Sequence, residues 1–351
     1  MNFTHDSLTQ TVRFGSGAAR TALADVTAGA ERIMLICTPR EADRAARITA
    51  DLPVALRHHD VAMHVPVEVA ERGRAAAAEA RADLLLCFGG GSAIGLAKAI
   101  ALTTSIPIVA VPTTYSGSEA TSMWGLTENG VKTTGVDPRV APRAILYDAD
   151  LTLGLPPDIG IASALNALAH SVDAMWGPRA DPIDRVLAAE SARALRVGLP
   201  AVAADPSDLA GREQVLYAAY LAATAFSSAG SGLHHKICHV LGGAFDLPHA
   251  QTHTAVLPHV LAFNAPAAPE AEARLATAFD AATAVAGLNS LYDEVRAPRS
   301  LRDLGMTEAD IAPAVEAILP LVPAGNPRPV TAADLDRILS DAWSGATPEP
   351  A

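Results

Sequence analysis

Short, uniformly apolar runs in the first 150 residues, each followed by a longer alanine-rich stretch, constrain the fold more than any other feature. Runs without polar alternation predict strands buried on both faces. The helical stretches between them predict parallel pairing, because a parallel crossover needs about a dozen residues or more. We predict strands at 33–37, 61–65, 84–88, 107–111 and 144–147, and helices at 41–50, 67–82 and 92–102. The first half is therefore predicted to be an α/β domain with a doubly wound, Rossmann-like parallel sheet.

The second half has a different sequence pattern and no convincing strand. After Leu155-Pro156-Pro157, alanine- and leucine-rich segments recur at helical period, separated by proline, glycine or Asp-Pro breaks. The predicted helices cover 160–176, 182–199, 208–229, 232–243, 250–264, 268–287, 307–319 and 332–344. We therefore predict an α/β domain at 1–155 and an all-helical domain at 156–351, and we expect a small-ligand site in a cleft between these unlike domains.

Charge and cysteine content argue against several classes of protein. Lys and Arg number 26 against 38 Asp and Glu, a net charge of −12, whereas a nucleic-acid-binding protein normally carries a basic excess. Cys37, Cys87 and Cys238 form no CxxC pair, so they predict no disulfide framework and a reducing compartment. No stretch has the pattern of a signal peptide or a membrane span. We expect a cytoplasmic protein that binds neither nucleic acid nor membrane.

Three consecutive glycines follow the third predicted strand, in Gly89-Gly90-Gly91-Ser92, where the next helix is expected to begin. Glycines at such a turn let backbone N–H groups approach a pyrophosphate, and the helix N-terminus adds positive potential. The run is not the G-x-G-x-x-G fingerprint, and a tight strand-to-helix turn is the alternative explanation. Three glycines exceed what a turn needs, so the run favours phosphate binding.

Small hydroxyl residues follow the next predicted strand, in Pro112-Thr113-Thr114-Tyr115-Ser116-Gly117-Ser118-Glu119. At the carboxyl end of a parallel strand, such residues suit hydrogen bonding to a ligand in the sheet crevice. The same residues are typical of a loop in which Ser116 or Ser118 caps the following segment. This motif alone does not decide between the two interpretations.

Histidines are concentrated in the helical half: seven of eleven lie between His170 and His259. Asn166 and His170 share one helix face at i,i+4, and His235 and His239 have the same spacing. One histidine on an apolar helix is usually a satisfied core residue, but a group of six or seven indicates a site. Metal ligation is the obvious interpretation of such a group.

Taken in order, these segments resemble the iron-containing (group III) alcohol dehydrogenase superfamily. The resemblance runs through Phe14–Gly17, Gly89–Ser92 with Leu96–Lys98, Pro112–Glu119, Lys132–Gly135, Leu151–Pro156, Ala164–His170, His234–Asn264 and Leu301–Ile311. It implies a dinucleotide-binding domain followed by a helical domain, in a dehydroquinate synthase-like architecture. It also implies NADH or NADPH as cofactor and a homodimer.

The superfamily's metal ligands, an Asp and three His, would fall on Asn166, His170, His235 and His249. Asn166 is a departure, because an amide oxygen is a weaker, uncharged ligand for a divalent cation. Gly95 is a second departure, since the metal enzymes typically carry Asp at that position. Both departures look like the maleylacetate reductase branch, which implies a small dicarboxylate substrate and no required metal. The alternatives are a metal-dependent alcohol or glycerol-type dehydrogenase and, with less support, a dehydroquinate-synthase-like lyase.

The resemblance also implies roles for individual residues. The expected catalytic residues are His170, His235, His239 and His249, and the expected substrate-binding residues are Asn166, Tyr115 and Lys236. The expected cofactor-binding residues are Gly89, Gly90, Gly91, Ser92, Thr113, Thr114, Ser118, Lys132, Leu151, Cys37 and Thr38. No acidic residue precedes Glu41 at the end of the first predicted strand, and Arg40 would tolerate a 2′-phosphate, so both NADH and NADPH are expected.

Overall fold

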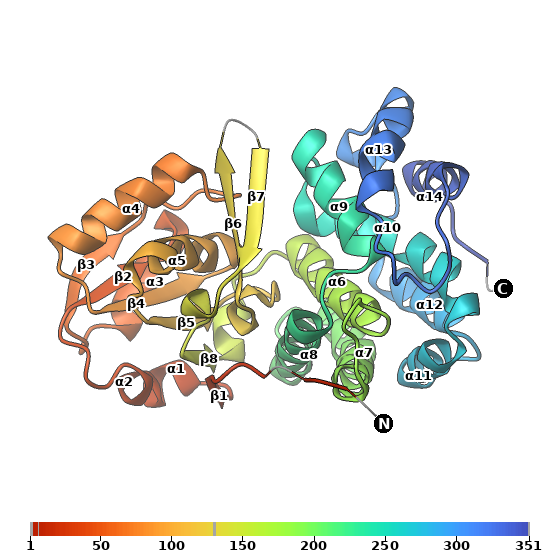
Figure 1. Ribbon diagram of the computed structural model, residues 1–351. Coiled ribbons are helices and arrows are strands. Elements are labelled where there is room, and N and C mark those ends of the chain that lie inside the picture. The colour runs from red at the N-terminus through yellow and green to blue at the C-terminus, as the bar shows by residue number, and fades with distance from the viewer. Residues whose placement is uncertain (1–2, 6, 129–130, 350–351) are drawn as a thin grey trace. The chain divides into compact units, whose positions relative to one another are not determined.

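The protein was analysed as a computed structural model that describes residues 3–5, 7–128 and 131–349. These residues form two compact units (Figure 1). The α/β unit is Leu8–Leu155, and the helical unit comprises the described parts of Pro156–Ala351 and of Met1–Ser7. His5 belongs with the helical unit because its imidazole pairs with Asp181, at the start of a helix of that unit. The division into domains at 1–155 and 156–351 stays a prediction.

A six-stranded, fully parallel sheet forms the centre of the α/β unit, as the sequence predicts. Its strand order is β1-β8-β5-β4-β2-β3. The strands are β1 (Thr11–Phe14), β2 (Ile33–Ile36), β3 (Val54–His58), β4 (Leu84–Gly89), β5 (Ile108–Pro112) and β8 (Ala144–Tyr147). The α-helices of this unit are α1 (Ala18–Thr21), α2 (Leu23–Val26), α3 (Ala42–Ile48), α4 (Val67–Glu79) and α5 (Gly91–Thr104).

Both faces of this sheet are buried, which explains why its central strands are apolar throughout. Along β4, Leu85 and Cys87 pack into one cluster with residues of α4 and α5. Leu84, Leu86 and Phe88 alternate with them and pack on the opposite face, in a cluster that includes residues of α1, α2 and α3. Helices on both faces of a parallel sheet make this a doubly wound fold.

The strand predicted at 61–65 is wrong. His64 and Val65 adopt left-handed backbone conformations, with φ of 59° and 47°, which a strand cannot contain. Their carbonyls instead accept hydrogen bonds from Thr127, whose hydroxyl reaches His64 at 2.8 Å and whose N–H reaches Val65 at 3.0 Å. The strand of this region is β3, an edge strand in which Arg57 interrupts the apolar pattern.

Besides β3, three further strands of the described residues were not predicted. β1 is short and mostly exposed, and it occupies the other edge of the sheet. β6 (Met123–Glu128) and β7 (Val131–Val136) pair antiparallel in a separate two-stranded sheet. Their sequences contain several polar residues and glycines, which weakens the apolar signal on which strand prediction depends.

The helical unit contains no strand among its described residues. Its α-helices are α6 (Pro157–Ala174), α7 (Pro182–Ala204), α8 (Leu209–Ala229), α9 (Leu233–Ala244), α10 (His249–Asn264), α11 (Pro269–Phe279), α12 (Ala284–Val295), α13 (Ile311–Ile318) and α14 (Ala332–Ser344). The segment predicted as one helix at 268–287 is two helices. Asp280 takes a left-handed conformation that ends α11, and the Thr283 hydroxyl caps the start of α12.

None of the described helices is long and apolar enough to cross a membrane.

The three cysteines are buried and form no disulfide bond, as the sequence predicts.

Candidate active site

The glycine turn lies at the carboxyl end of β4, in the middle of the sheet. Gly89 has a φ of +148°, and a Cβ on Gly90 would approach the Thr114 side chain to 2.7 Å, so both positions require glycine. Gly90 is the N-cap of α5, where no side chain caps the helix and no acidic residue lies in the first turn. Backbone N–H groups at this helix N-terminus are therefore available to an anion, and the residues present fit a pyrophosphate.

Most of the predicted cofactor residues lie at the same edge of the sheet. Cys37 and Thr38 directly follow β2, whose Ile36 is in register with Cys87 of β4. Thr113 directly follows β5, and its N–H donates to the Gly89 carbonyl at 3.1 Å. The chain turns outward from β2 to β3 and then crosses back to β4, so the point where the strand order reverses lies between β2 and β4. That is where nucleotides bind in open α/β sheets.

The other predicted cofactor residues have different surroundings. Ser92 lies in the first turn of α5, and Ser118 begins a 3₁₀ turn after β5. Leu151 follows β8 and packs in the same apolar cluster as Cys37. Lys132 lies exposed on β7, in the two-stranded sheet.

A buried lysine fixes the loop after β5. Lys98, on α5, donates from Nζ to the Thr121 and Met123 carbonyls, each at 2.8 Å. Glu119, in the same loop, is fully buried and accepts a hydrogen bond from the Tyr147 hydroxyl at 2.8 Å. Tyr115 is also fully buried in this loop. These contacts hold the hydroxyl-rich segment against the end of the sheet.

Gly95 is tightly enclosed. A Cβ there would come within 2.8 Å of the Val65 side chain. Any side chain at this position would therefore require Val65 to move.

In the helical unit, α6, α9 and α10 bring together the predicted catalytic histidines. The rings of His170 and His235 are stacked, with centroids 4.9 Å apart, and the centroids of His235 and His239 are 5.9 Å apart. His249, exposed at the start of α10, reaches the group through His253, with ring centroids 4.5 Å apart. We call the six rings of His170, His234, His235, His239, His249 and His253 the histidine cluster.

Asp173 orients the central ring of this cluster. Its Oδ2 lies 2.7 Å from His235 Nδ1 and accepts hydrogen bonds from the backbone N–H groups of Gly232 and His235, each at 3.1 Å. Burial raises the pKa of the Asp173 carboxyl to about 7, and these N–H donors oppose that rise. The Nδ1 of His235 is thereby engaged. Its Nε2 is buried and has no hydrogen-bond partner among the described residues.

The buried histidines are held in the neutral form. Burial lowers the pKa of His170 to about 4 and that of His234 to about 3. It also lowers the pKa values of His235 and His253 well below their usual range, and the neighbouring imidazoles lower them further. These four rings therefore offer neutral imidazoles near pH 7.

Asn166, one helical turn before His170 on α6, is also buried, and its Oδ1 has no described partner. Lys236 lies half-buried on α9, next to His235 in sequence.

The ligand atoms that lie close together in the cluster are not those of the positions that match the superfamily's metal ligands. Only His234, His235 and His253 bring ligand atoms within 4.8 Å of one another in the cluster, whereas the described ligand atoms of His170, His235 and His249 form no such group. Within the former group, His234 Nε2 and His253 Nδ1 are hydrogen-bonded to each other at 2.9 Å. A metal there would have to break that bond, and Asn166 supplies no charge to compensate.

Asp173, His234 and His253 were not among the predicted site residues. Asp173 lies three residues after His170 and seven after Asn166, so helical spacing places all three on one face of α6. His253 similarly follows His249 by four residues on α10. That periodicity was the signal that could have identified Asp173 and His253.

Comparisons with known proteins agree with this architecture. Residues 9–149 match the family model for iron-containing alcohol dehydrogenase, and residues 160–343 match that for the C-terminal region of the Fe-containing alcohol dehydrogenase family. The chain is 44% identical over 351 residues to a maleylacetate reductase of Sphingobium indicum, covering 99% of each chain.

Two solved structures are similar over nearly their whole length. A maleylacetate reductase from Rhizobium is 40% identical, with a TM-score of 0.94 and 99% of each chain covered. An iron-containing alcohol dehydrogenase from Corynebacterium glutamicum is 55% identical, with a TM-score of 0.96, covering 98% of this chain and 97% of that one.

The packing of Asp173 yields a stability prediction. In Gly232→Ala the new Cβ would lie 2.5 Å from Asp173 Oδ1, which displaces the carboxylate from His235. We expect a loss of about 1–3 kcal/mol in the free energy of unfolding, measured by urea denaturation.

Gly243→Ala is the matched control, because Gly243 lies on the same helix with nothing within 4 Å of its added Cβ. It should leave stability unchanged or slightly raised. Equal losses in the two variants would contradict the packing described for Asp173.

Proposed function

The chain belongs to the iron-containing alcohol dehydrogenase family, and from this premise we propose that it is an NAD(P)H-dependent maleylacetate reductase. It would reduce the conjugated C=C bond of maleylacetate to give 3-oxoadipate, in the bacterial degradation of aromatic compounds. The observation that carries the proposal is the histidine cluster: its buried rings are neutral, Asn166 stands in place of an acidic ligand, and one ring is oriented by Asp173.

An alkene conjugated to a ketone can be reduced without a Lewis acid. Hydride from nicotinamide C4 adds to the alkene carbon β to the ketone, and the electron pair of the double bond moves to form an enolate. Hydrogen-bond donors stabilise the enolate oxygen, and an acid protonates the α carbon. An isolated carbonyl, by contrast, is usually polarised by a metal in this family of reactions. Neutral imidazoles without a carboxylate ligand suit the first reaction better than the second.

We assign the proton transfer to His235, acting with Asp173. Burial disfavours a net negative charge on this pair, so the pair retains a second proton close to neutrality. With that proton, His235 carries hydrogen on Nε2 whichever partner holds the proton between Nδ1 and Oδ2. Nε2 is buried and has no described protein partner, so its hydrogen-bonding capacity is not used within the protein. Loss of the Nε2 proton to the α carbon leaves the pair negatively charged, and solvent then restores the proton.

The two substrate carboxylates need local donors, because the overall charge of −12 repels a dianion. Asn166 removes one negative charge relative to the metal enzymes, and its amide is a neutral hydrogen-bonding group. We propose Asn166, Lys236 and Tyr115 as substrate-binding residues, and His170, His239 and His249 as partners of His235 in binding the enolate.

For the cofactor, we propose that the glycine turn binds the pyrophosphate and that NADH and NADPH are both used. No acidic side chain lies between β2 and Glu41 to bind a ribose 2′-hydroxyl and repel a 2′-phosphate. Glu41 itself lies 3.8 Å from the Arg44 guanidinium. Arg40 is exposed and donates to the Gly154 carbonyl at 3.0 Å, with further N–H groups left for a phosphate.

A homodimer is proposed as well, because β1 is an edge strand paired on one side only within the described sheet, and such an edge suits strand addition. A cytoplasmic location stays a prediction from the sequence.

The direct test is loss of NADH or NADPH absorbance with maleylacetate, with and without a strong chelator. We expect turnover with both cofactors that survives chelation. Activity confined to simple alcohols or aldehydes and abolished by chelation would instead identify a metal-dependent dehydrogenase. Strict NADH dependence would contradict our interpretation that the residues after β2 tolerate the 2′-phosphate of NADPH.

The Asn166→Asp variant sharpens this test, because it restores the charged ligand of the metal enzymes. It should bind divalent metal more tightly and reduce maleylacetate more slowly, since the new carboxylate repels the dianion. An unchanged reductase rate would mean that Asn166 has no part in substrate binding.

The role of the Asp173–His235 pair predicts a pH dependence. Turnover should fall as pH rises through about 7, because the pair then loses the proton that it donates. Asp173→Asn should lower kcat by about 10²–10⁴-fold and remove that inflection. A variant with the wild-type pH profile would show that Asp173 only supports the packing of α9.

A further inference from the structure

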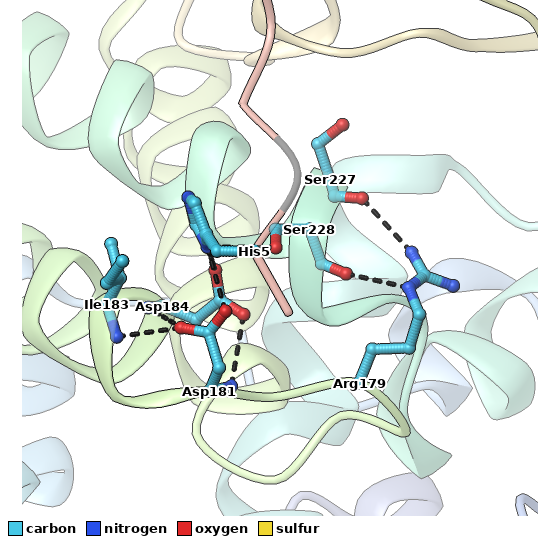
Figure 2. A network of polar contacts seen from close by, with 7 residues as sticks. All are labelled: His5, Arg179, Asp181, Ile183, Asp184, Ser227 and Ser228. Carbon is cyan, nitrogen blue, oxygen red and sulfur yellow. Dashed lines mark hydrogen bonds and ion pairs between the residues drawn. The ribbon is translucent and has the colours of Figure 1, made fainter. Parts of the chain in front are cut away.

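A second group of potential ligands lies in the helical unit outside the histidine cluster. His5 meets two aspartates at the start of α7, Asp181 and Asp184, and Figure 2 shows the imidazole directed at both carboxylates. Their side chains are almost entirely enclosed, with 2% and 0% of their surface exposed, and the His5 side chain is 13% exposed. The proposed function uses none of the three.

The aspartates are held rigidly by the helix end that they cap. Asp181 Oδ1 accepts hydrogen bonds from the N–H groups of Ile183 and Asp184, at 2.7 and 3.0 Å. Asp184 Oδ2 accepts from the N–H of Asp181 at 3.2 Å, which completes a capping box. One oxygen of each carboxylate is thus engaged. The other two, Asp181 Oδ2 and Asp184 Oδ1, are left facing His5.

The charge of these two oxygens is poorly compensated. His5 Nδ1 lies 2.8 Å from Asp181 Oδ2 and 3.5 Å from Asp184 Oδ1, and Asp184 Oδ1 is buried with no hydrogen-bond partner among the described residues. The nearby Arg179 donates to the carbonyls of Ser227 and Ser228 and not to the acids (Figure 2). One imidazole and the Ser228 hydroxyl therefore face two enclosed carboxylates, which is an arrangement that favours a cation.

We propose that His5 Nδ1, Asp181 Oδ2 and Asp184 Oδ1 form a structural site for a divalent transition metal, with Zn²⁺ as the ion that fits best. The three atoms lie within 4.8 Å of one another. Bonds of about 2.0–2.1 Å place neighbouring ligand atoms of a tetrahedral zinc site about 3.3–3.5 Å apart. His5 Nδ1 lies 2.8 Å from Asp181 Oδ2 and 3.5 Å from Asp184 Oδ1, on either side of that value. Small side-chain movements would therefore bring the three atoms to the spacing of a zinc site.

Binding replaces the Nδ1 hydrogen with the metal. Without metal, the Nδ1 hydrogen is donated to Asp181. When Zn²⁺ binds, Nδ1 gives up that hydrogen and offers its lone pair to the ion, while Nε2 carries the hydrogen of the neutral imidazole and the two carboxylates balance the ion's charge. Ser228 Oγ, 3.3 Å from His5 Nδ1, or a water would complete four-coordination. The ion would fasten His5 to the N-terminus of α7 and the end of α8.

The test uses the full chain, stripped with chelator, dialysed against Zn²⁺ and counted by inductively coupled plasma mass spectrometry. His5→Gln leaves the capping box intact, and it should bind one zinc fewer than wild type or bind it more than about 100-fold more weakly. Zn²⁺ should also raise the thermal midpoint of wild type by several degrees but not that of His5→Gln.

His58→Gln is the matched control, because His58 lies on β3 in the other unit and in neither histidine group. It should keep the wild-type zinc count and thermal shift. Any zinc at the histidine cluster is common to all variants and cancels in the comparison. Equal zinc counts in wild type and His5→Gln would overturn the proposal, and so would full zinc binding by Asp184→Asn.

Discussion

The contact between Asp173 and the start of α9 is the interaction on which the candidate site depends. One carboxylate oxygen accepts the first N–H groups of the helix and also holds the His235 imidazole. Helix starts leave such N–H groups without partners, so a buried carboxylate there stabilises both the helix and itself. The residue at the N-cap must be glycine, because a Cβ would occupy the position of the carboxylate. The backbone conformation at Gly232, at the start of α9, and the orientation of the His235 ring are thus coupled through Asp173.

The surroundings of that pair explain the chemistry that the site favours. Imidazoles packed against each other away from water cannot all be charged, and burial keeps His170 and His234 neutral well below pH 7. With Asn166 completing the group, no charged ligand remains for a metal among the positions where the superfamily carries one. The proposed reduction of a conjugated alkene needs hydride, donors for an enolate and one proton, and none of these requires a Lewis acid.

Much of the fold follows from sequence patterns, and the errors have local causes. Central strands such as β4 are buried on both faces, so their apolar runs were readily identified, whereas β3 has Arg57 among its residues and was missed. The apolar run 61–65 was misassigned because the left-handed conformation of His64 and Val65 depends on hydrogen bonds from Thr127, which is distant in sequence. In the site, motif resemblance identified His235, and helical spacing after His170 was a signal for Asp173. That Asp173 pairs with His235 is recognised only from the contact between α6 and α9.

The central claim is that hydride goes to carbon, at the alkene, and not to a carbonyl. Reduction of maleylacetate with NADH deuterated at the transferring C4 position tests it most directly, with the product analysed by nuclear magnetic resonance. The account predicts deuterium on the methylene carbon β to an intact ketone, with a proton from solvent on the neighbouring α carbon. Deuterium on a carbinol carbon, in a hydroxy acid that keeps its double bond, would contradict it.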